Sequence, residues 1–150
     1  MLFRSKADAA DTVPESRDTN NTAGRAISIG PDLTNSSLLA PLSTAAGSTV
    51  AVTDGVMNQG ADGAGPSTSR FYLSTNITLD ANDVPLAATR AVPSLAAGES
   101  SSGTTAVIIP AATVPGTYYL FAVADADGAV AETLEANNSR WRSIQVTAGP

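Results

Sequence analysis

Residues 116–124 read GTYYLFAVA and constrain the fold more than any other stretch of this chain. In an extended chain successive side chains point to opposite faces, so Leu120 and Ala122 share one face while Tyr119 and Phe121 share the other. Both faces are apolar. A strand that is apolar on both faces is typical of the interior of a sheet, so this segment predicts a central strand.

Other runs of β-forming residues lie along the chain, and turn residues separate them. Val, Ile, Thr and aromatic residues favour strands, whereas Gly, Pro, Asn and Asp interrupt them. Besides the central strand, we expect strands over residues 32–39, 48–60, 68–75, 84–92, 103–110 and 140–146. Seven such runs predict an all-β fold, an immunoglobulin-like β-sandwich of about seven antiparallel strands with no helix longer than one turn within residues 48–147.

Alternation within these strands predicts the side chains that face the core. The expected core consists of Val50, Val52, Leu73, Val107, Leu120 and Ile144. Asp54 falls on the inward parity of its strand, where a carboxylate is costly, so we expect a bulge at Gly55 that turns it outward. Tyr118, two residues after Gly116, resembles a tyrosine corner, whose hydroxyl bonds to upstream backbone.

The first 30 residues differ in composition from the rest of the chain. They are polar, mixed in charge and poor in large apolar side chains, which predicts a flexible N-terminal arm ahead of a sandwich over residues 31–147. The full length of 150 residues suits one domain with a core of its own. No apolar run approaches the roughly 20 residues of a membrane-spanning helix, so we expect no membrane span.

Charge and composition exclude several classes of function. The net charge is −6 and the Lys and Arg residues form no cluster, so we expect no nucleic-acid partner. The chain has no cysteine and no histidine, which excludes disulfides, thiol and imidazole catalysis and the usual zinc and haem ligands. Glu132 and Glu135 could form a glycosidase pair, but no pocket is evident around them. We therefore expect no enzyme and no catalytic residues.

Acidic residues gather in the loop after the central strand. Asp125, Asp127 and Glu132, with Glu135 and the loop residue Asp62 close by, could supply the oxygen ligands that Ca²⁺ requires. The alternative is that these carboxylates are solvated or bond to nearby backbone amides in a turn. The spacing is not that of an EF-hand, so calcium is the one cofactor that the sequence leaves open.

Several segments, in order along the chain, resemble the CARDB family, the "cell adhesion related domain found in bacteria". They are PDL at 31–33, VMNQG at 56–60, RFYLST at 70–75, VPSLAAGES at 92–100, IPAATVPGTYYLFAVADADG at 109–128 and AETLEANN at 131–138. Each segment alone would be a weak signal, but their shared order is specific. The resemblance covers about residues 31–147 and leaves the N-terminal arm outside it.

The resemblance implies an immunoglobulin-like module of secreted or surface proteins of bacteria and archaea, with no catalytic residues to transfer. We therefore expect a non-catalytic extracellular or cell-surface module that serves adhesion or spacing through contact with other proteins or cell-surface components. The alternative is a structural subunit of a larger assembly, such as a filament, sheath or capsid coat. In that case the N-terminal arm would dock onto a neighbouring subunit.

One face of the sandwich is a candidate for partner binding. If the strands at 68–75, 116–124 and 140–146 lie side by side with their aliphatic residues inward, aromatic side chains gather on the outer face. These side chains are Tyr72, Tyr119, Phe121 and Trp141. An outward aromatic patch favours an interaction surface. The alternative is that the arm or the loop after residue 75 covers the patch within the same chain.

Overall fold

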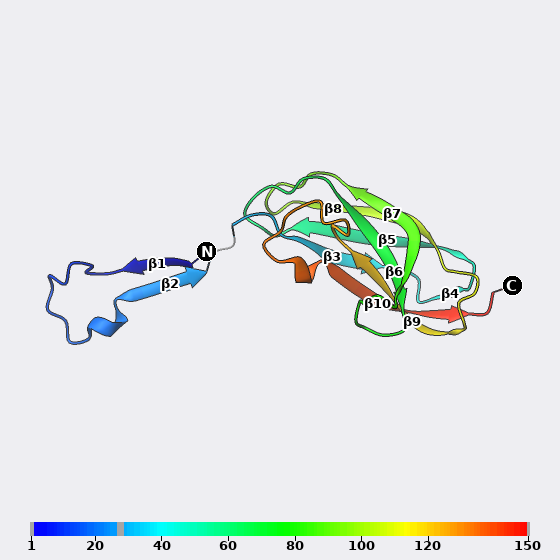
Figure 1. The fold of residues 1–150 in the computed structure, drawn as a ribbon, viewed down its shortest axis with the longest axis horizontal. Coiled ribbons are helices and arrows are strands. Elements are labelled where there is room, and N and C mark those ends of the chain that lie inside the picture. The colour runs from blue at the N-terminus through cyan, green and yellow to red at the C-terminus, as the bar shows by residue number, and fades with distance from the viewer. Residues whose placement is uncertain (1, 27–28, 150) are drawn as a thin grey trace.

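The computed structural model describes residues 2–26 and 29–149, and its regular secondary structure is strands apart from two 3₁₀ turns (Figure 1). Two sheets face each other. One has the order β3-β5-β8, formed by β3 (Leu33–Leu39), β5 (Thr49–Asn58) and β8 (Ser100–Ile108). The other has the order β4-β10-β9-β6-β7, formed by β4 (Ser43–Ala45), β10 (Ser139–Thr147), β9 (Gly116–Val123), β6 (Ser67–Ser74) and β7 (Val84–Val92). This arrangement confirms the predicted all-β sandwich.

The predicted central strand is β9, which lies in the middle of the five-stranded sheet. It pairs antiparallel with β10 on one side and with β6 on the other, so Leu120 lies between Arg142 and Leu73. Leu120 and Ala122 are fully buried between the sheets. A single 3₁₀ turn, η2 (Glu135–Asn137), is the one helical element that the structure describes within residues 48–147.

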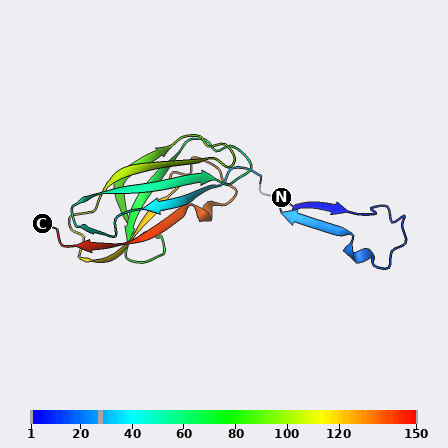
Figure 2. The same cartoon turned by 180° about the vertical axis from the view of Figure 1, so that it is seen from behind.

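Two elements lie outside the predicted strands. β4 falls in a segment that the sequence indicates as a connection, and it pairs in parallel with Gln145–Thr147 at the sheet edge. In the N-terminal arm, β1 (Leu2–Lys6) and β2 (Thr22–Ala26) form an antiparallel hairpin, with the 3₁₀ turn η1 (Asp18–Asn20) between them. The hairpin extends away from one end of the sandwich in both views (Figures 1 and 2). The division of the chain into an arm and a domain stays a prediction.

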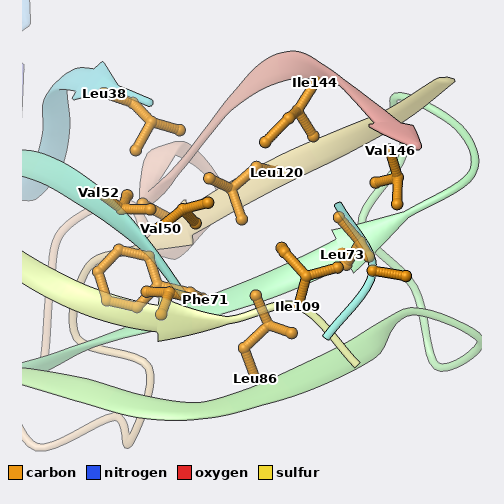
Figure 3. Close-up of a cluster of buried hydrophobic side chains, with 13 residues drawn as sticks. Leu38, Val50, Val52, Phe71, Leu73, Leu86, Ile109, Leu120, Ile144 and Val146 are labelled. Atoms are coloured by element: carbon orange, nitrogen blue, oxygen red, sulfur yellow. The ribbon is translucent and has the colours of Figure 1, made fainter. Parts of the chain in front are cut away.

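The core lies between the two sheets. Its main cluster is aliphatic apart from Phe71, and side chains from both sheets meet in it (Figure 3). The structure confirms burial of all six predicted core residues, Val50, Val52, Leu73, Val107, Leu120 and Ile144. A second, smaller cluster around Leu33, Val56 and Leu95 fills the end of the sandwich from which the arm leaves.

The predicted bulge at Gly55 is wrong, because β5 pairs with β8 in one continuous register. The irregularity lies instead in the neighbouring strand β3, between Asn35 and Ser37. Asp54 therefore keeps its inward parity and is fully buried.

Asp54 is tolerated in the core because its carboxylate has partners on both of its oxygens. Arg90 on β7 donates from Nε to Oδ1 at 2.7 Å and from Nη2 to Oδ2 at 2.8 Å. The Ser69 hydroxyl on β6 donates to Oδ2 at 2.8 Å. Asp54 belongs to one sheet while Arg90 and Ser69 belong to the other, so this buried ion pair joins the two sheets.

The predicted tyrosine corner is confirmed. The Tyr118 hydroxyl, at the start of β9, donates a hydrogen bond to the backbone carbonyl of Val114 at 3.0 Å. This bond fixes the bend through which the chain enters β9.

Candidate functional site

The acidic loop after β9 uses its first two carboxylates for structure. Asp125 is buried, has a positive φ of 43°, and accepts the backbone N–H groups of Ala129 at 3.0 Å and Val130 at 2.9 Å. Asp127 forms an ion pair with Arg70 at 2.6 Å. Asp125 matches the alternative in which turn carboxylates bond to nearby backbone amides, whereas Asp127 pairs with an arginine that the alternative did not foresee.

Glu132 joins the same loop to the first strand of the sandwich. One carboxylate oxygen accepts the backbone N–H of Leu33, and the other accepts the Asn138 side-chain amide at 3.0 Å. Burial raises the pKa of Glu132 to about 7, an effect that these two donors oppose and that the nearby charges of Glu135 and Asp125 increase. The carboxylate therefore titrates near neutral pH.

The start of β3 is held by further polar contacts from two loops. The Asp32 carboxylate accepts Asn137 Nδ2 at 2.8 Å and Gln59 Nε2 at 3.1 Å. The Thr133 N–H donates to the Pro31 carbonyl at 3.0 Å. These bonds anchor the point at which the arm joins the sandwich, and the sequence reasoning did not identify Asp32 as part of them.

The structure does not bring the four residues proposed for calcium together into one group. Asp125, Asp127 and Glu132 already hold donors, and the Asp62 side chain is exposed in a separate loop. Within residues 2–26 and 29–149, no group of three or more acidic side chains is placed to hold a metal ion. Calcium binding at this loop stays a prediction.

Replacing Glu132 with glutamine is expected to remove a pH dependence of stability. A folded-state pKa raised above the unfolded value adds stability that is present at low pH and is lost as pH rises through the folded pKa. The free energy of unfolding of the parent chain should therefore fall between about pH 5 and about pH 8, by about 1 kcal/mol because solvent screens a partly buried group. Urea denaturation across this range measures the effect, and a parent curve as flat as that of Glu132→Gln would contradict it.

The aromatic residues proposed for partner binding share the outer face of the five-stranded sheet. Tyr72 on β6 and Trp141 on β10 both lie opposite Phe121 on β9, which confirms the predicted parity. The rings of Tyr119 and Trp141 meet edge to face, with centroids 5.1 Å apart and planes at 89°. Trp141 is 44% exposed, and Tyr72 and Tyr119 are half-buried.

Phe121 departs from the predicted exposed patch, because it is only 2% exposed. Tyr72 and Trp141 flank it on the neighbouring strands. The loop between β6 and β7 lies close enough for Ile77 and Leu79 to line a pocket together with Val123, the next outward residue of β9. The loop after residue 75 thus covers part of the outer face near Val123, which is part of the alternative considered from the sequence. Tyr72, Tyr119 and Trp141 stay accessible.

Two shallow apolar pockets lie at the other end of the sandwich, and sequence reasoning did not find them. Each has a volume of about 330 Å³, and Pro110 lines both. Val84, Ile108 and Val114 are exposed around them. Their one titratable lining residue is Tyr118, whose hydroxyl already bonds to backbone, so the pockets offer apolar surface without acid–base chemistry.

The described part of the chain contains no helix with the length and apolarity that a membrane crossing needs.

Solved structures with the same sandwich include archaeal domains. A crystal structure of the CARDB domain of a Pyrococcus furiosus protein, in complex with di-metal ions, is 24% identical, with a TM-score of 0.59 over 82% of this chain and 94% of that chain. A solution structure of the same domain is 23% identical, with a TM-score of 0.58 over 81% and 99%. A domain described as part of a cell surface protein from Methanosarcina acetivorans is 22% identical, with a TM-score of 0.57 over 79% and 94%. Because all three sequence identities are below 25%, these similarities establish the fold of this chain and nothing more.

No curated protein matches the chain. The family model named CARDB matches residues 30–142, which include β3 to β9 and the first part of β10. The match covers most of the chain and agrees with the fold of the similar structures, so the chain belongs to the CARDB family.

Proposed function

We propose that this chain is a non-catalytic cell-surface module that serves adhesion or spacing, and that it contacts its partner through the outer face of the five-stranded sheet. The observation that carries the proposal is the aromatic group of Tyr72, Tyr119 and Trp141 on that face. Trp141 is 44% exposed and held edge to face by Tyr119.

Tryptophan and tyrosine in such a position favour protein recognition for physical reasons. Each buries a large apolar area on contact, and each keeps a polar atom for hydrogen bonding. Because Tyr119 fixes the Trp141 ring before binding, little side-chain entropy is lost on contact. Membership of the CARDB family and the likeness to a domain of a described cell surface protein support the surface location.

Replacing Trp141 with serine is expected to weaken binding to a cell surface while leaving the fold intact. Labelled chain is incubated with bacterial or archaeal cells, and bound fluorescence is measured at rising concentration. The half-saturating concentration should rise by about tenfold or more, as for loss of an aromatic anchor. The melting temperature should change little, because Trp141 is 44% exposed.

Ile108→Ser provides the matched control. Ile108 lies on the opposite sheet and is 61% exposed, a larger fraction than for Trp141. This variant should bind as the parent chain does. Equal binding by Trp141→Ser and the parent, or a lower melting temperature as its sole effect, would refute the proposed face.

A second candidate function is a subunit of a larger assembly that docks through its arm. The hairpin of β1 and β2 favours it, because a two-stranded hairpin is marginally stable alone and gains stability from packing on another surface. Removing residues 1–30 should then abolish association in sedimentation velocity experiments while the circular dichroism of the sandwich persists. A full chain that sediments as a monomer at every concentration would argue against assembly. The cell-surface module would then be the remaining candidate function.

A further inference from the structure

Four Asn-X-Ser/Thr tripeptides lie along the chain, and the structure gives them different surroundings. They begin at Asn20, Asn35, Asn76 and Asn137. This tripeptide is the acceptor sequence for N-linked glycosylation when X is not proline, and the modified asparagine must lie on the surface of the folded protein. A chain rich in Asn, Ser and Thr contains such tripeptides by chance. Burial and hydrogen bonding therefore decide which of the four can carry a glycan.

Two of the four asparagines are held inside the fold. Asn35 is 4% exposed, and both Nδ2 and Oδ1 of its amide are buried. Asn137 donates from Nδ2 to the Asp32 carboxylate at 2.8 Å, and its Oδ1 is also buried. A glycan on Asn35 would disrupt the packing around its amide, and one on Asn137 would crowd the contact that holds the start of β3. Neither side chain suits a glycan acceptor.

The tripeptide at Asn20 lies within secondary structure. Asn20 is exposed, but it is the last residue of the 3₁₀ turn η1. Thr22 is the first residue of β2, and it pairs with Lys6. A transferase must bind the asparagine and the threonine of the tripeptide together, and here the end of the hairpin would have to open first. This tripeptide is therefore exposed but constrained.

The tripeptide at Asn76 lies in a surface loop. Asn76, Ile77 and Thr78 follow the end of β6 in the loop that leads to β7, and all three are exposed. Asn76 Oδ1 accepts the backbone N–H of Thr78 at 2.7 Å, so the tripeptide forms an Asx turn. The hydrogen bonds of Asn76 in the described chain use Oδ1 and the backbone N–H and leave Nδ2 without a partner. The nitrogen that carries an N-linked glycan is therefore available.

We propose that Asn76 is an N-glycosylation site, which accepts an oligosaccharide from a polyprenyl phosphate or diphosphate donor. Nδ2 forms a bond to the anomeric carbon of the first sugar. The bond between that carbon and the phosphate oxygen breaks, and the lipid phosphate leaves with the bonding electrons. One Nδ2 proton passes to a base of the transferase. The inference rests on the proposed cell-surface location, because N-linked glycans belong to surface loops of secreted proteins.

The test is export of the full chain, behind a signal peptide, from an archaeal cell that N-glycosylates its surface proteins. The same chain kept in the cytosol is the reference. Trypsin cuts after arginine and lysine, so each tripeptide falls in a peptide of its own, namely 18–25, 26–70, 71–90 and 91–140. Tandem mass spectrometry should find a sugar-bearing form of peptide 71–90 in the exported chain alone, with the sugar on Asn76.

Asn76→Asp should abolish the modification and keep the fold, because aspartate accepts the Thr78 N–H in the same turn but has no amide nitrogen. Thr78→Ala should also abolish it, whereas Thr78→Ser keeps the acceptor sequence and should retain it. Asn82→Gln is the matched control, because Asn82 is exposed in the same loop and outside any acceptor sequence. It should be modified as the parent chain is, and all four variants should melt as the parent does.

The inference fails if peptide 71–90 of the exported chain carries no sugar, if another of the four tripeptides is modified in its place, or if Thr78→Ala is modified as the parent is. The added signal peptide supplies export, so these results do not depend on where the chain acts. An exported chain that lacks the glycan and still binds cells through Trp141 would refute this inference and leave the proposed function intact.

Discussion

Replacing Arg90 with alanine is expected to lower the free energy of unfolding by about 3–5 kcal/mol, the cost of leaving a buried charge without its partner. Asp54 is fully buried and receives two bonds from the Arg90 guanidinium. Without Arg90, the Ser69 hydroxyl remains as its one donor in the described chain. A single hydroxyl cannot offset the removal of a carboxylate from water, so the variant must unfold more readily.

The double variant Asp54→Leu, Arg90→Leu separates the loss of a partner from the value of the pair. Exchange of a whole buried ion pair for apolar side chains is often neutral or stabilising, so the double variant should recover most of the lost stability. Urea denaturation followed by Trp141 fluorescence measures both. A cost below about 1 kcal/mol for Arg90→Ala would mean that the pair is solvated and does not join the sheets.

The fold was largely predictable because its signal lies in the alternation of side chains along single strands. β9 shows this best, since its two apolar faces already place it in the middle of a sheet. The same reasoning failed at Asp54, because parity shows where a side chain points but not what it meets. Arg90 is 36 residues further along the chain and on the other sheet, so no local pattern links the two residues.

The candidate site was less predictable, because its character depends on contacts between distant loops. The sequence of an acidic loop is the same whether its carboxylates bind a cation or accept hydrogen bonds from backbone amides. In the structure, the Asp125 carboxylate accepts hydrogen bonds from backbone amides of its own loop. The loop after β6 has no periodic pattern, so its approach to Val123 on the outer face could not be predicted.

Replacing Leu120 with alanine is expected to cost about 2–5 kcal/mol of stability through lost burial and the cavity left behind. Leu120 is fully buried in the middle strand, so structure on both sides limits how far the cavity can collapse. Thr117→Ala on the same strand is the control, because Thr117 is exposed and should change stability by less than about 0.5 kcal/mol. The denaturation midpoint should fall while the slope stays constant, since the same surface is exposed on unfolding. A cost below about 1 kcal/mol would mean that the two sheets close over the missing side chain, and the core would then be less tightly packed than the full burial of Leu120 indicates.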